Sequence, residues 1–381
     1  MNKMMKFYYI ANYRFPSERA HSIQVAENCQ AFADLGYELV LLAPQRRTSI
    51  QKDFFEFYGL KKNFSIRKIF CLDLLDKFPN RFTFWLQNVT FNFSILFILR
   101  HKEPSIIYSR DFLSVIFLAL LGRELVFEVH NISAHVSFLR NKLFNKVRYV
   151  VISHGLKEAL IKIGIDSNNI LVAPDGVNTD KFLINSTVEK NDLKKKFHWP
   201  LDQKILLYTG QLYEWKGVVI LLAAASSLPR YQVCIVGGSA DQIDQLKKKF
   251  PADNIFFMGQ QAYSNLPLFL QAADCLVLPN SSKEKISKYY TSPMKLFEYL
   301  SSGVPIVAAD LPSIREIVSE KEVYFFEADN PQSLAQSVQS VFVDPVVAKI
   351  KTGASQKKAE EFSWKNRVDK ISKFLHNEKS F

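Results

Sequence analysis

Short apolar runs alternate with stretches of helical spacing from the start of the chain. Residues 7–11 are apolar and aromatic, residues 21–35 have helical spacing of apolar side chains, and residues 38–43 are apolar again. Gly36 follows the helical stretch, at a place where glycine commonly ends a helix. The pattern predicts a strand, a helix and a second strand, the unit from which parallel sheets are built.

The same alternation continues along the chain. Short apolar runs predict further strands at residues 105–108, 125–129, 149–152, 205–209, 232–236, 254–258, 275–279 and 305–308. Helices are expected in the second half at residues 218–228, 243–249, 266–273 and 293–301. Strands that alternate with helices form parallel sheets covered on both faces. We therefore expect an α/β fold of two Rossmann-like, doubly wound domains facing a cleft, with ligands at the carboxyl ends of the strands.

Two domains also fit the length of 381 residues, which is too long for one ordinary hydrophobic core. The polar, lysine-rich residues 185–196 lie near the middle of the chain and predict a linker or a surface helix. Apolar residues make up 48% of the chain and charged residues 23%, which is typical of a folded globular protein and not of a disordered one.

One uncharged stretch, residues 82–99, is rich in phenylalanine and long enough to cross a membrane. Polar residues recur along it, however, and such residues are costly in hydrocarbon. They are Gln87, Asn88, Thr90, Asn92 and Ser94. A buried core helix is favoured, a helix that lies on a membrane surface is the second alternative, and a span is the third.

The chain carries 49 basic and 37 acidic residues, a formal charge of +12. Residues 1–190 hold 25 basic and 17 acidic residues, so most of the surplus lies in the first half. Such a surface attracts phosphate groups of nucleic acid, anionic lipid or diphosphate-linked substrates, or is simply solvated. No nucleic-acid-binding module is recognisable, so we expect no nucleic acid partner.

The four cysteines are isolated in the sequence and show no Cys-x-x-Cys spacing. They are Cys29, Cys71, Cys234 and Cys275. This spacing predicts neither a disulfide framework nor a zinc site. The apolar run near residue 7 is too short for a signal peptide. A cytoplasmic location is expected.

The first candidate for chemistry is the start of the helix expected at residues 293–301. Ser292 is a good N-cap and Pro293 suits the first helical position. The free N–H groups of such a helix start bind a diphosphate without a cation. Glu298 lies on the same side of the helix as Met294 and Lys295, within reach of a ribose, although an ordinary capped helix with an exposed glutamate gives the same pattern.

A second candidate lies where the strand at 205–209 turns into a helix. Gly210 lets a ligand approach the backbone, and Lys216 supplies a positive charge for phosphate, although their spacing is not that of a P-loop. Gly237 and Gly259 follow later strands, where exposed backbone can meet a base. No Gly-x-Gly-x-x-Gly is present, so a nicotinamide cofactor is not expected.

In the first half, His130 follows the strand at 125–129 and can orient or deprotonate a hydroxyl, although a single histidine at a strand end is more often structural. Asp175 lies in a turn near the domain junction. The chain contains no Asp-x-Asp, Gly-x-Ser-x-Gly or His-Glu-x-x-His. These absences exclude the commonest hydrolase and zinc sites, and no metal is expected.

Three segments in order, residues 210–217, 292–300 and 302–308, resemble the retaining glycosyltransferases of family four, which have the GT-B fold. The resemblance covers nearly the whole chain. It implies an acceptor-side domain at 1–184, a nucleotide-sugar donor domain at 197–361, and a C-terminal helix at 362–381 that crosses back to the first domain.

The resemblance implies that Lys216 contacts the donor diphosphate and that Glu298 binds the ribose. It also implies that both residues act in catalysis. The helix start around Ser292 would receive phosphate oxygens. The remaining donor-binding residues would be Gly210, Gln211, Gly237, Gly259, Thr291, Pro293, Met294 and Lys295.

On the acceptor side, the resemblance implies that His130 faces the transferred sugar and is a catalytic residue. Arg14, Ser17 and His21 match the first loop, which borders the cleft. The segment at residues 108–111 resembles a family segment without an assigned role.

Two positions depart from the family pattern. Gln211 stands where many members have an arginine, so one positively charged contact to the donor phosphate is missing. Tyr290 stands where many have a glutamate, which puts contacts to the donor sugar in doubt.

The resemblance implies hexose transfer from a UDP- or GDP-linked sugar, without metal or other cofactor, to a glycan or lipid-linked acceptor in surface polysaccharide or lipopolysaccharide synthesis. The basic first half and residues 82–99 suggest peripheral contact with an anionic membrane at its inner face. A nucleotide-sugar epimerase of the same fold and a binding protein that has lost catalysis are the alternatives.

Overall fold

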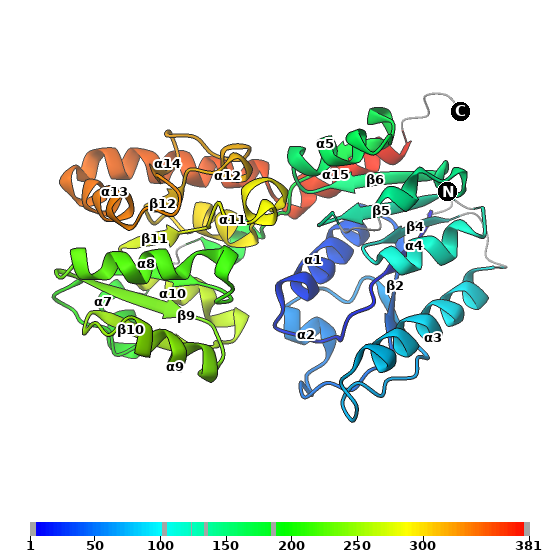
Figure 1. Ribbon diagram of the computed structural model, residues 1–381, viewed down its shortest axis with the longest axis horizontal. Coiled ribbons are helices and arrows are strands. Elements are labelled where there is room, and N and C mark those ends of the chain that lie inside the picture. The colour runs from blue at the N-terminus through cyan, green and yellow to red at the C-terminus, as the bar shows by residue number, and fades with distance from the viewer. Residues whose placement is uncertain (1–4, 101–104, 123, 133–135, 184–187, 377–381) are drawn as a thin grey trace. The chain divides into compact units, whose positions relative to one another are not determined.

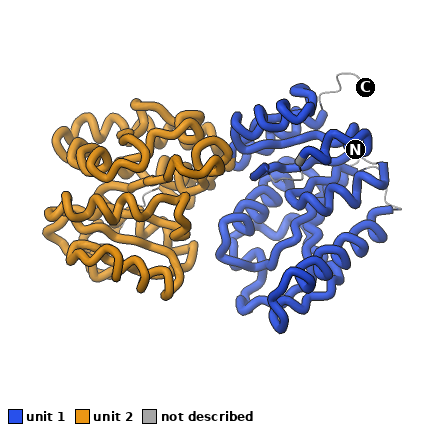
Figure 2. Tube along the Cα trace, viewed as in Figure 1, with its two compact units in different colours: residues 1–174, 364–381 blue, residues 175–363 orange. Residues whose placement is uncertain are grey.

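The computed structural model describes residues 5–100, 105–122, 124–132, 136–183 and 188–376. The chain divides into two compact units (Figure 2). Unit 1 contains Met1–Pro174 together with Trp364–Phe381, and unit 2 contains Asp175–Ser363.

Unit 1 is built on a seven-stranded parallel sheet in the order β3-β2-β1-β4-β5-β6-β7. The strands are β1 (Lys6–Ile10), β2 (Glu38–Pro44), β3 (Ser65–Ile69), β4 (Ile106–Ser109), β5 (Leu125–Val129), β6 (Val147–Val151) and β7 (Ile170–Val172). The helices are α1 (Ala20–Asp34), α2 (Phe54–Tyr58), α3 (Arg81–Leu99), α4 (Phe112–Ala119), α5 (His154–Lys162) and α15 (Trp364–His376). Figure 1 shows these helices flanking the sheet. The strand order reverses between β1 and β4, which is where doubly wound sheets bind ligands.

Unit 2 has a six-stranded parallel sheet in the order β10-β9-β8-β11-β12-β13. The strands are β8 (Lys204–Thr209), β9 (Tyr231–Val236), β10 (Ile255–Gly259), β11 (Cys275–Leu278), β12 (Ile306–Ala309) and β13 (Tyr324–Phe326). The α-helices are α6 (Thr179–Phe182), α7 (Lys190–Lys196), α8 (Val218–Ala224), α9 (Ala240–Lys249), α10 (Leu266–Ala272), α11 (Met294–Ser301), α12 (Pro312–Arg315), α13 (Pro331–Val343) and α14 (Pro345–Glu361). The buried faces of these helices and both faces of the sheet form one hydrophobic core.

Helix α15 returns the chain to unit 1 and packs against α1. The Tyr37 hydroxyl lies 2.7 Å from Ser372 Oγ and 2.8 Å from His376 Nε2, and Arg148 donates hydrogen bonds to the carbonyls at the end of the helix. Unit 1 is therefore completed by residues from the far end of the chain.

The predicted α/β architecture with parallel sheets is confirmed, and each predicted strand is present within two residues of its expected limits. Strands β3, β7 and β13 were not predicted, because each lies at the edge of a sheet and is either polar or only three residues long. The helix expected at 218–228 ends at Ala224 and continues as a 3₁₀ turn to Ser227.

Residues 190–196 of the lysine-rich stretch form α7, whereas residues 185–187 lie outside the described residues. Lys194 of α7 is buried, and its Nζ lies 2.9 Å from a carboxylate oxygen of Asp274. This part of the stretch packs on unit 2 and is not a free linker.

Residues 82–99 lie within α3. Among the described residues it is the one helix long and apolar enough to cross a membrane, and only 39% of its most apolar window is buried. It packs against α4 and β3 of unit 1, as the predicted core helix would, but five of its aromatic side chains are exposed.

Candidate active site

Helix α11 begins at Met294, and Pro293 is its N-cap residue without a side-chain cap. The prediction that Ser292 caps this helix and that Pro293 is its first residue is wrong. Ser292 Oγ instead accepts a hydrogen bond of 2.9 Å from the backbone N–H of Asp175, within unit 2. Because no side chain caps α11, its first N–H groups are available to an anion.

Lys295 is buried in the first turn of α11, and its Nζ has no hydrogen-bond partner among the described residues. The ammonium group lies 3.8 Å from the centre of the Tyr208 ring. A Cβ atom placed on Gly210 would lie 3.1 Å from Lys295 Nζ, so the side chain reaches the end of β8. Burial, together with the charge of Lys216, holds the pKa of Lys295 well below its ordinary value, although Glu298 opposes this shift.

Lys216 ends the 3₁₀ turn η4 (Glu214–Lys216), and its ammonium group lies 3.8 Å from the centre of the Trp215 ring. Burial lowers the pKa of Lys216 to about 8, although Asp175 and Glu298 favour its charged form. Gly217 follows in the left-handed conformation, and a Cβ atom there would lie 1.8 Å from the carbonyl oxygen of Pro279. The close approach of these two loops therefore requires glycine and fixes the position of Lys216.

Glu298 is buried, so the alternative of an exposed glutamate is wrong. The Tyr263 hydroxyl donates a hydrogen bond of 2.9 Å to Glu298 Oε1. Burial raises the pKa of Glu298 to about 7, against the opposing effects of Tyr263, Lys295 and Lys216. The carboxyl group can thus change its charge near neutral pH.

The other predicted donor residues lie at or just after the carboxyl ends of β8, β9 and β10 and at the start of α11. Thr291 is buried, Met294 is half-buried in the first turn of α11, and the Gln211 side chain is exposed. Gly237 packs on the turn after β8, because a Cβ atom there would lie 2.0 Å from the carbonyl oxygen of Gly210. Gly259 ends β10 with positive φ. Tyr290, the last residue of the π-helical turn η7 (Ile286–Tyr290), is half-buried.

Sequence reasoning missed Asn280, which follows the carboxyl end of β11. It is fully buried, and neither amide atom has a hydrogen-bond partner among the described residues. Its neighbour Ser281 donates from its backbone N–H to the Trp215 carbonyl oxygen at 3.1 Å, which places Asn280 beside the loop of Lys216. A lone asparagine after a strand carries no sequence signal for this environment.

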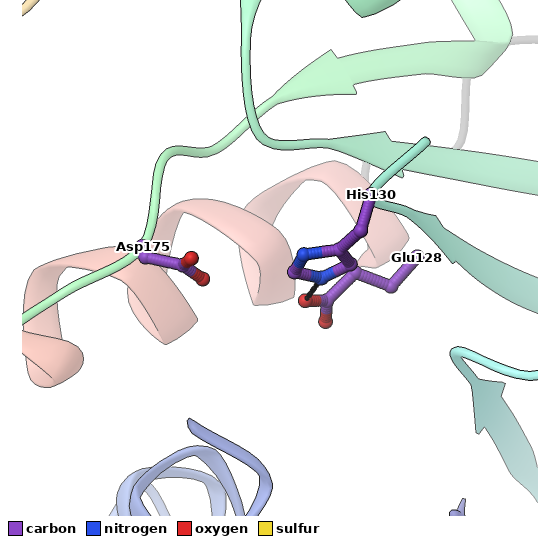
Figure 3. A group of neighbouring side chains, drawn as sticks. All are labelled: Glu128, His130 and Asp175. Atoms are coloured by element: carbon purple, nitrogen blue, oxygen red, sulfur yellow. Dashed lines mark hydrogen bonds and ion pairs between the residues drawn. The ribbon is translucent and has the colours of Figure 1, made fainter. Parts of the chain in front are cut away.

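In unit 1, Glu128 and His130 lie side by side (Figure 3), because residues two apart at the end of a strand point to the same face. His130 Nε2 lies 2.5 Å from Glu128 Oε1. The Glu128 carboxylate is fully buried, receives a hydrogen bond from the Tyr108 hydroxyl and lies 3.1 Å from Arg367 of α15. Burial opposes its ionisation, but Arg367, His130 and Arg110 outweigh burial and keep the pKa of Glu128 well below its ordinary value.

Glu128 was also missed, since a glutamate inside an apolar strand shows its role only when its partners are known. The ionised carboxylate fixes the orientation of the His130 ring through Nε2.

The predicted acceptor-side residues do not form a single cluster. Arg14 pairs with Asp73 and Asp76, and Ser17 is held by hydrogen bonds with the Tyr58 hydroxyl. Burial, followed by the charges of Arg110, Arg19 and His130, lowers the pKa of His21 to about 4. His21 therefore lies close enough to His130 to be affected by its charge. Arg14 and Ser17 thus support the first loop, whereas His21 belongs to the neighbourhood of His130.

Two family models match the chain. Residues 21–181 match Glycosyltransferase Family 4, and residues 189–361 match Glycosyl transferases group 1. The chain belongs to glycosyltransferase family 4.

Similar curated proteins include TuaC of Bacillus subtilis, a glycosyltransferase assigned to teichuronic acid biosynthesis, with 26% identity over 50% of this chain and 45% of TuaC. An uncharacterized glycosyltransferase of Methanocaldococcus jannaschii is 24% identical over 90% of both chains. The chain spans about half the length of TuaC and 58% of a second Methanocaldococcus jannaschii relative.

Solved structures confirm the predicted GT-B fold of this family member. HepE of Anabaena, determined with UDP and glucose, has a TM-score of 0.76 at 14% identity, covering 98% of this chain and all of HepE. WaaG, a glycosyltransferase involved in lipopolysaccharide biosynthesis, has a TM-score of 0.67 at 11% identity, covering 97% of this chain and all of WaaG.

Proposed function

We propose that this protein transfers a hexose from a nucleotide diphosphate sugar to an acceptor with retention of anomeric configuration. The observation that carries the proposal is the buried amino group of Lys295, which has no hydrogen-bond partner among the described residues and lies beside Lys216 and the uncapped start of α11. A buried cation without a partner is costly unless an anion binds to it. A diphosphate supplies that anion.

In the proposed mechanism, Lys216, Lys295 and the first N–H groups of α11 hold the diphosphate. The bond between the anomeric carbon and the diphosphate oxygen breaks, the oxygen of the acceptor hydroxyl attacks from the same face, and the hydroxyl proton passes to the departing diphosphate oxygen. The lysines and helix dipoles stabilise the negative charge that grows on the departing nucleotide. These fixed groups do the work that a metal does in sites with paired aspartates, so we propose a metal-independent reaction.

Glu298 is assigned to the ribose. Its Oε1 accepts from Tyr263, which leaves Oε2 to accept a hydrogen bond from a ribose hydroxyl. Asn280 adds a free donor and a free acceptor beside the same loops. We assign the remaining polar contacts of the donor to backbone groups near Gly210, Gly237 and Gly259.

His130 is assigned to the transferred sugar. The hydrogen bond that Nε2–H donates to the Glu128 carboxylate orients the ring toward a sugar hydroxyl. Glu128 acts through His130 and is a positioning residue.

For the acceptor we propose a glycan or lipid-linked molecule of surface polysaccharide synthesis, used at the cytoplasmic face of the membrane. The support is the assignment of two relatives, TuaC and WcaI of Escherichia coli, to teichuronic and colanic acid biosynthesis. The base of the donor, UDP or GDP, is left to experiment.

The test is a thermal-shift panel with UDP, GDP, ADP, CDP and NAD on the wild type and on Glu298→Ala. A shift for one diphosphate that disappears in the variant supports the donor site, and a shift with NAD alone contradicts it. Incubation with the matching sugar nucleotide and lipid-linked acceptors follows, with and without EDTA. Loss of transfer in EDTA would contradict metal independence, a new sugar nucleotide without acceptor would indicate an epimerase, and binding without turnover would indicate a binding protein.

A further inference from the structure

Helix α3 buries several polar residues and exposes five of its six aromatic side chains. Thr83, Gln87, Asn88 and Asn92 are buried, although they are polar residues of an apolar helix. Hydrogen bonds of 2.8 Å link both Gln87 and Asn88 to the side chain of Asn12. The inward face is thus tied to unit 1 by polar contacts, which a lipid-spanning helix would have to break.

The outward face of α3 carries a continuous aromatic stripe. Phe82, Trp85, Phe93 and Phe97 lie on one side of the helix, because their spacings of 3, 8 and 4 residues return to the same face. Each is at least 57% exposed, and Phe70 beside them is 61% exposed. Scattered exposed aromatics are ordinary, but a stripe along a 19-residue helix marks an interaction surface.

Basic side chains frame this stripe. Arg81 and Arg100 stand at its two ends, and the Arg100 guanidinium lies 4.0 Å from the centre of the Phe97 ring. Residues 64–100 contain five basic residues and two acidic ones, and both acidic side chains are paired with arginine. Among the described residues, the unpaired charge around the stripe is therefore positive.

A hollow of about 670 Å³ lies between α3 and β3 at this surface. Aromatic and basic residues line it together, among them Arg67, Phe70, Phe93, Phe97 and Arg100. Figure 1 shows α3 at the margin of unit 1, beside the sheet and away from its centre.

We propose that the outward face of α3, with its basic ends and this hollow, docks on a bilayer that contains anionic phospholipid. Aromatic rings enter the boundary between headgroups and acyl chains, while guanidinium groups bind lipid phosphates. Lysine is depleted at protein interfaces, whereas Lys68 lines this hollow together with two arginines and no acidic residue, so an anionic lipid surface fits it better than a protein partner. The helix lies on the membrane and does not cross it.

The full-length protein is sedimented with vesicles of phosphatidylcholine and phosphatidylglycerol in equal parts, and with vesicles of phosphatidylcholine alone. We expect binding to the anionic vesicles that weakens as salt is raised. The double variant Phe93→Ser/Phe97→Ser should bind about tenfold more weakly, because it loses two inserted rings. The matched control Val343→Ser/Ile350→Ser removes equally exposed apolar side chains from α13 and α14 and should bind like the wild type.

Thermal midpoints and nucleotide shifts are measured on each variant, so that loss of the lipid surface is separated from misfolding and from failure of the donor proposal. Blue-shifted tryptophan emission on vesicles, lost in Trp85→Phe, would support insertion of this face. Equal binding by the Phe93→Ser/Phe97→Ser variant, or no binding by the wild type at low salt, would overturn the proposal. A wild-type dimer that this variant converts to monomers would also overturn it, since the face would then belong to a second copy.

Discussion

At the scale of single residues, Lys295 and Asn280 are among the buried polar side chains of unit 2 whose hydrogen-bonding groups are unused among the described residues. Lys295 offers donors only, whereas Asn280 offers both donors and an acceptor. Both adjoin the loops that carry Gly210 and Lys216. Such groups are maintained at a cost in folding free energy, which a bound nucleotide recovers.

The first prediction is that Lys295→Met weakens nucleotide binding but does not weaken the fold. The wild type buries an ammonium group without a partner, and methionine fills the same space without that cost. Affinity for the preferred nucleoside diphosphate should fall roughly 10- to 150-fold, the value of a charged hydrogen bond of about 1.5–3 kcal/mol. Isothermal titration and urea unfolding measure the two effects.

Lys247→Met, at an exposed lysine of α9, is the control for Lys295→Met and should change neither quantity. If Lys295→Met lowered stability and affinity together, Lys295 would be a structural residue. Because Gln211 stands where many relatives have arginine, we expect Gln211→Arg to restore part of the affinity that Lys295→Met loses.

The second prediction concerns pH. The pKa of Glu298 is raised from 4.5 to about 7 in the folded protein, so its contribution to stability is full below about pH 4.5 and is lost as the pH rises through 7. Glu298→Gln removes this loss and should be more stable than the wild type at pH 8, by up to about 3 kcal/mol. Paired urea titrations at pH 5 and pH 8 measure the difference.

Nucleotide affinity should change with pH in the opposite direction to stability as Glu298 ionises. Ionised Glu298 accepts from ribose, so affinity rises through pH 7, and it falls above about pH 8 as Lys216 loses its proton. In Glu298→Gln the rise should disappear and the fall remain. A stability difference that does not depend on pH would contradict the assignment of a buried, titrating carboxyl.

At the scale of elements, a buried ion pair joins α15 to the rest of unit 1, in addition to the hydrogen bonds near the end of the helix. Arg367 lies 3.1 Å from Glu128 and donates to the Pro174 carbonyl oxygen and to Asn28. The same Glu128 carboxylate orients His130. The packing of α15 and the orientation of His130 therefore depend on one side chain.

The third prediction is that Arg367→Met destabilises the protein by about 3–5 kcal/mol, because it leaves the Glu128 charge buried without its partner. The double variant Arg367→Met/Glu128→Gln should recover most of that loss and yet transfer sugar more slowly than the wild type, since an amide holds the His130 ring by a weaker hydrogen bond than a carboxylate does. Urea unfolding and a transfer assay measure the two properties. A double variant as unstable as Arg367→Met would show that the arginine acts through its other contacts.

The elements also show what the sequence could and could not predict. Buried central strands such as β5 and β8 were predicted because continuous apolar runs identify them. Edge strands β3, β7 and β13 lack such runs, and α11 begins one residue later than expected because Ser292 is used by Asp175 and not by the helix. Lys216 and Glu298 became candidates from local sequence and received their roles from the family resemblance, whereas Glu128 and Asn280 depend on partners far away in the chain, which no local pattern contains.

At the scale of the whole molecule, the two units differ in how the chain forms them. Unit 2 is continuous from Asp175 to Ser363 and contains Lys216, Lys295, Glu298 and its own hydrophobic core. Its two ends meet, since Val177 donates its backbone N–H to Phe362 at 2.9 Å and pairs with Ser363. Unit 1 needs α15 from the other end of the chain.

The fourth prediction follows from this asymmetry. A fragment of residues 175–363 should fold cooperatively and bind the preferred nucleoside diphosphate, because a domain with its own core and closely spaced ends folds alone. It should not transfer sugar, since it lacks His130. Circular dichroism, thermal melting and isothermal titration test the fragment.

Residues 1–174 alone should remain unfolded or aggregate, because Glu128 is then buried without Arg367 and the surface of α1 that α15 covers is exposed. Adding a peptide of residues 364–376 should raise the thermal midpoint of this fragment, and a peptide with Arg367→Met should not. If 175–363 failed to bind nucleotide while the full-length protein bound it, the donor site would need groups from unit 1. If 1–174 folded without the peptide, α15 would be an accessory to that unit and not a part of its core.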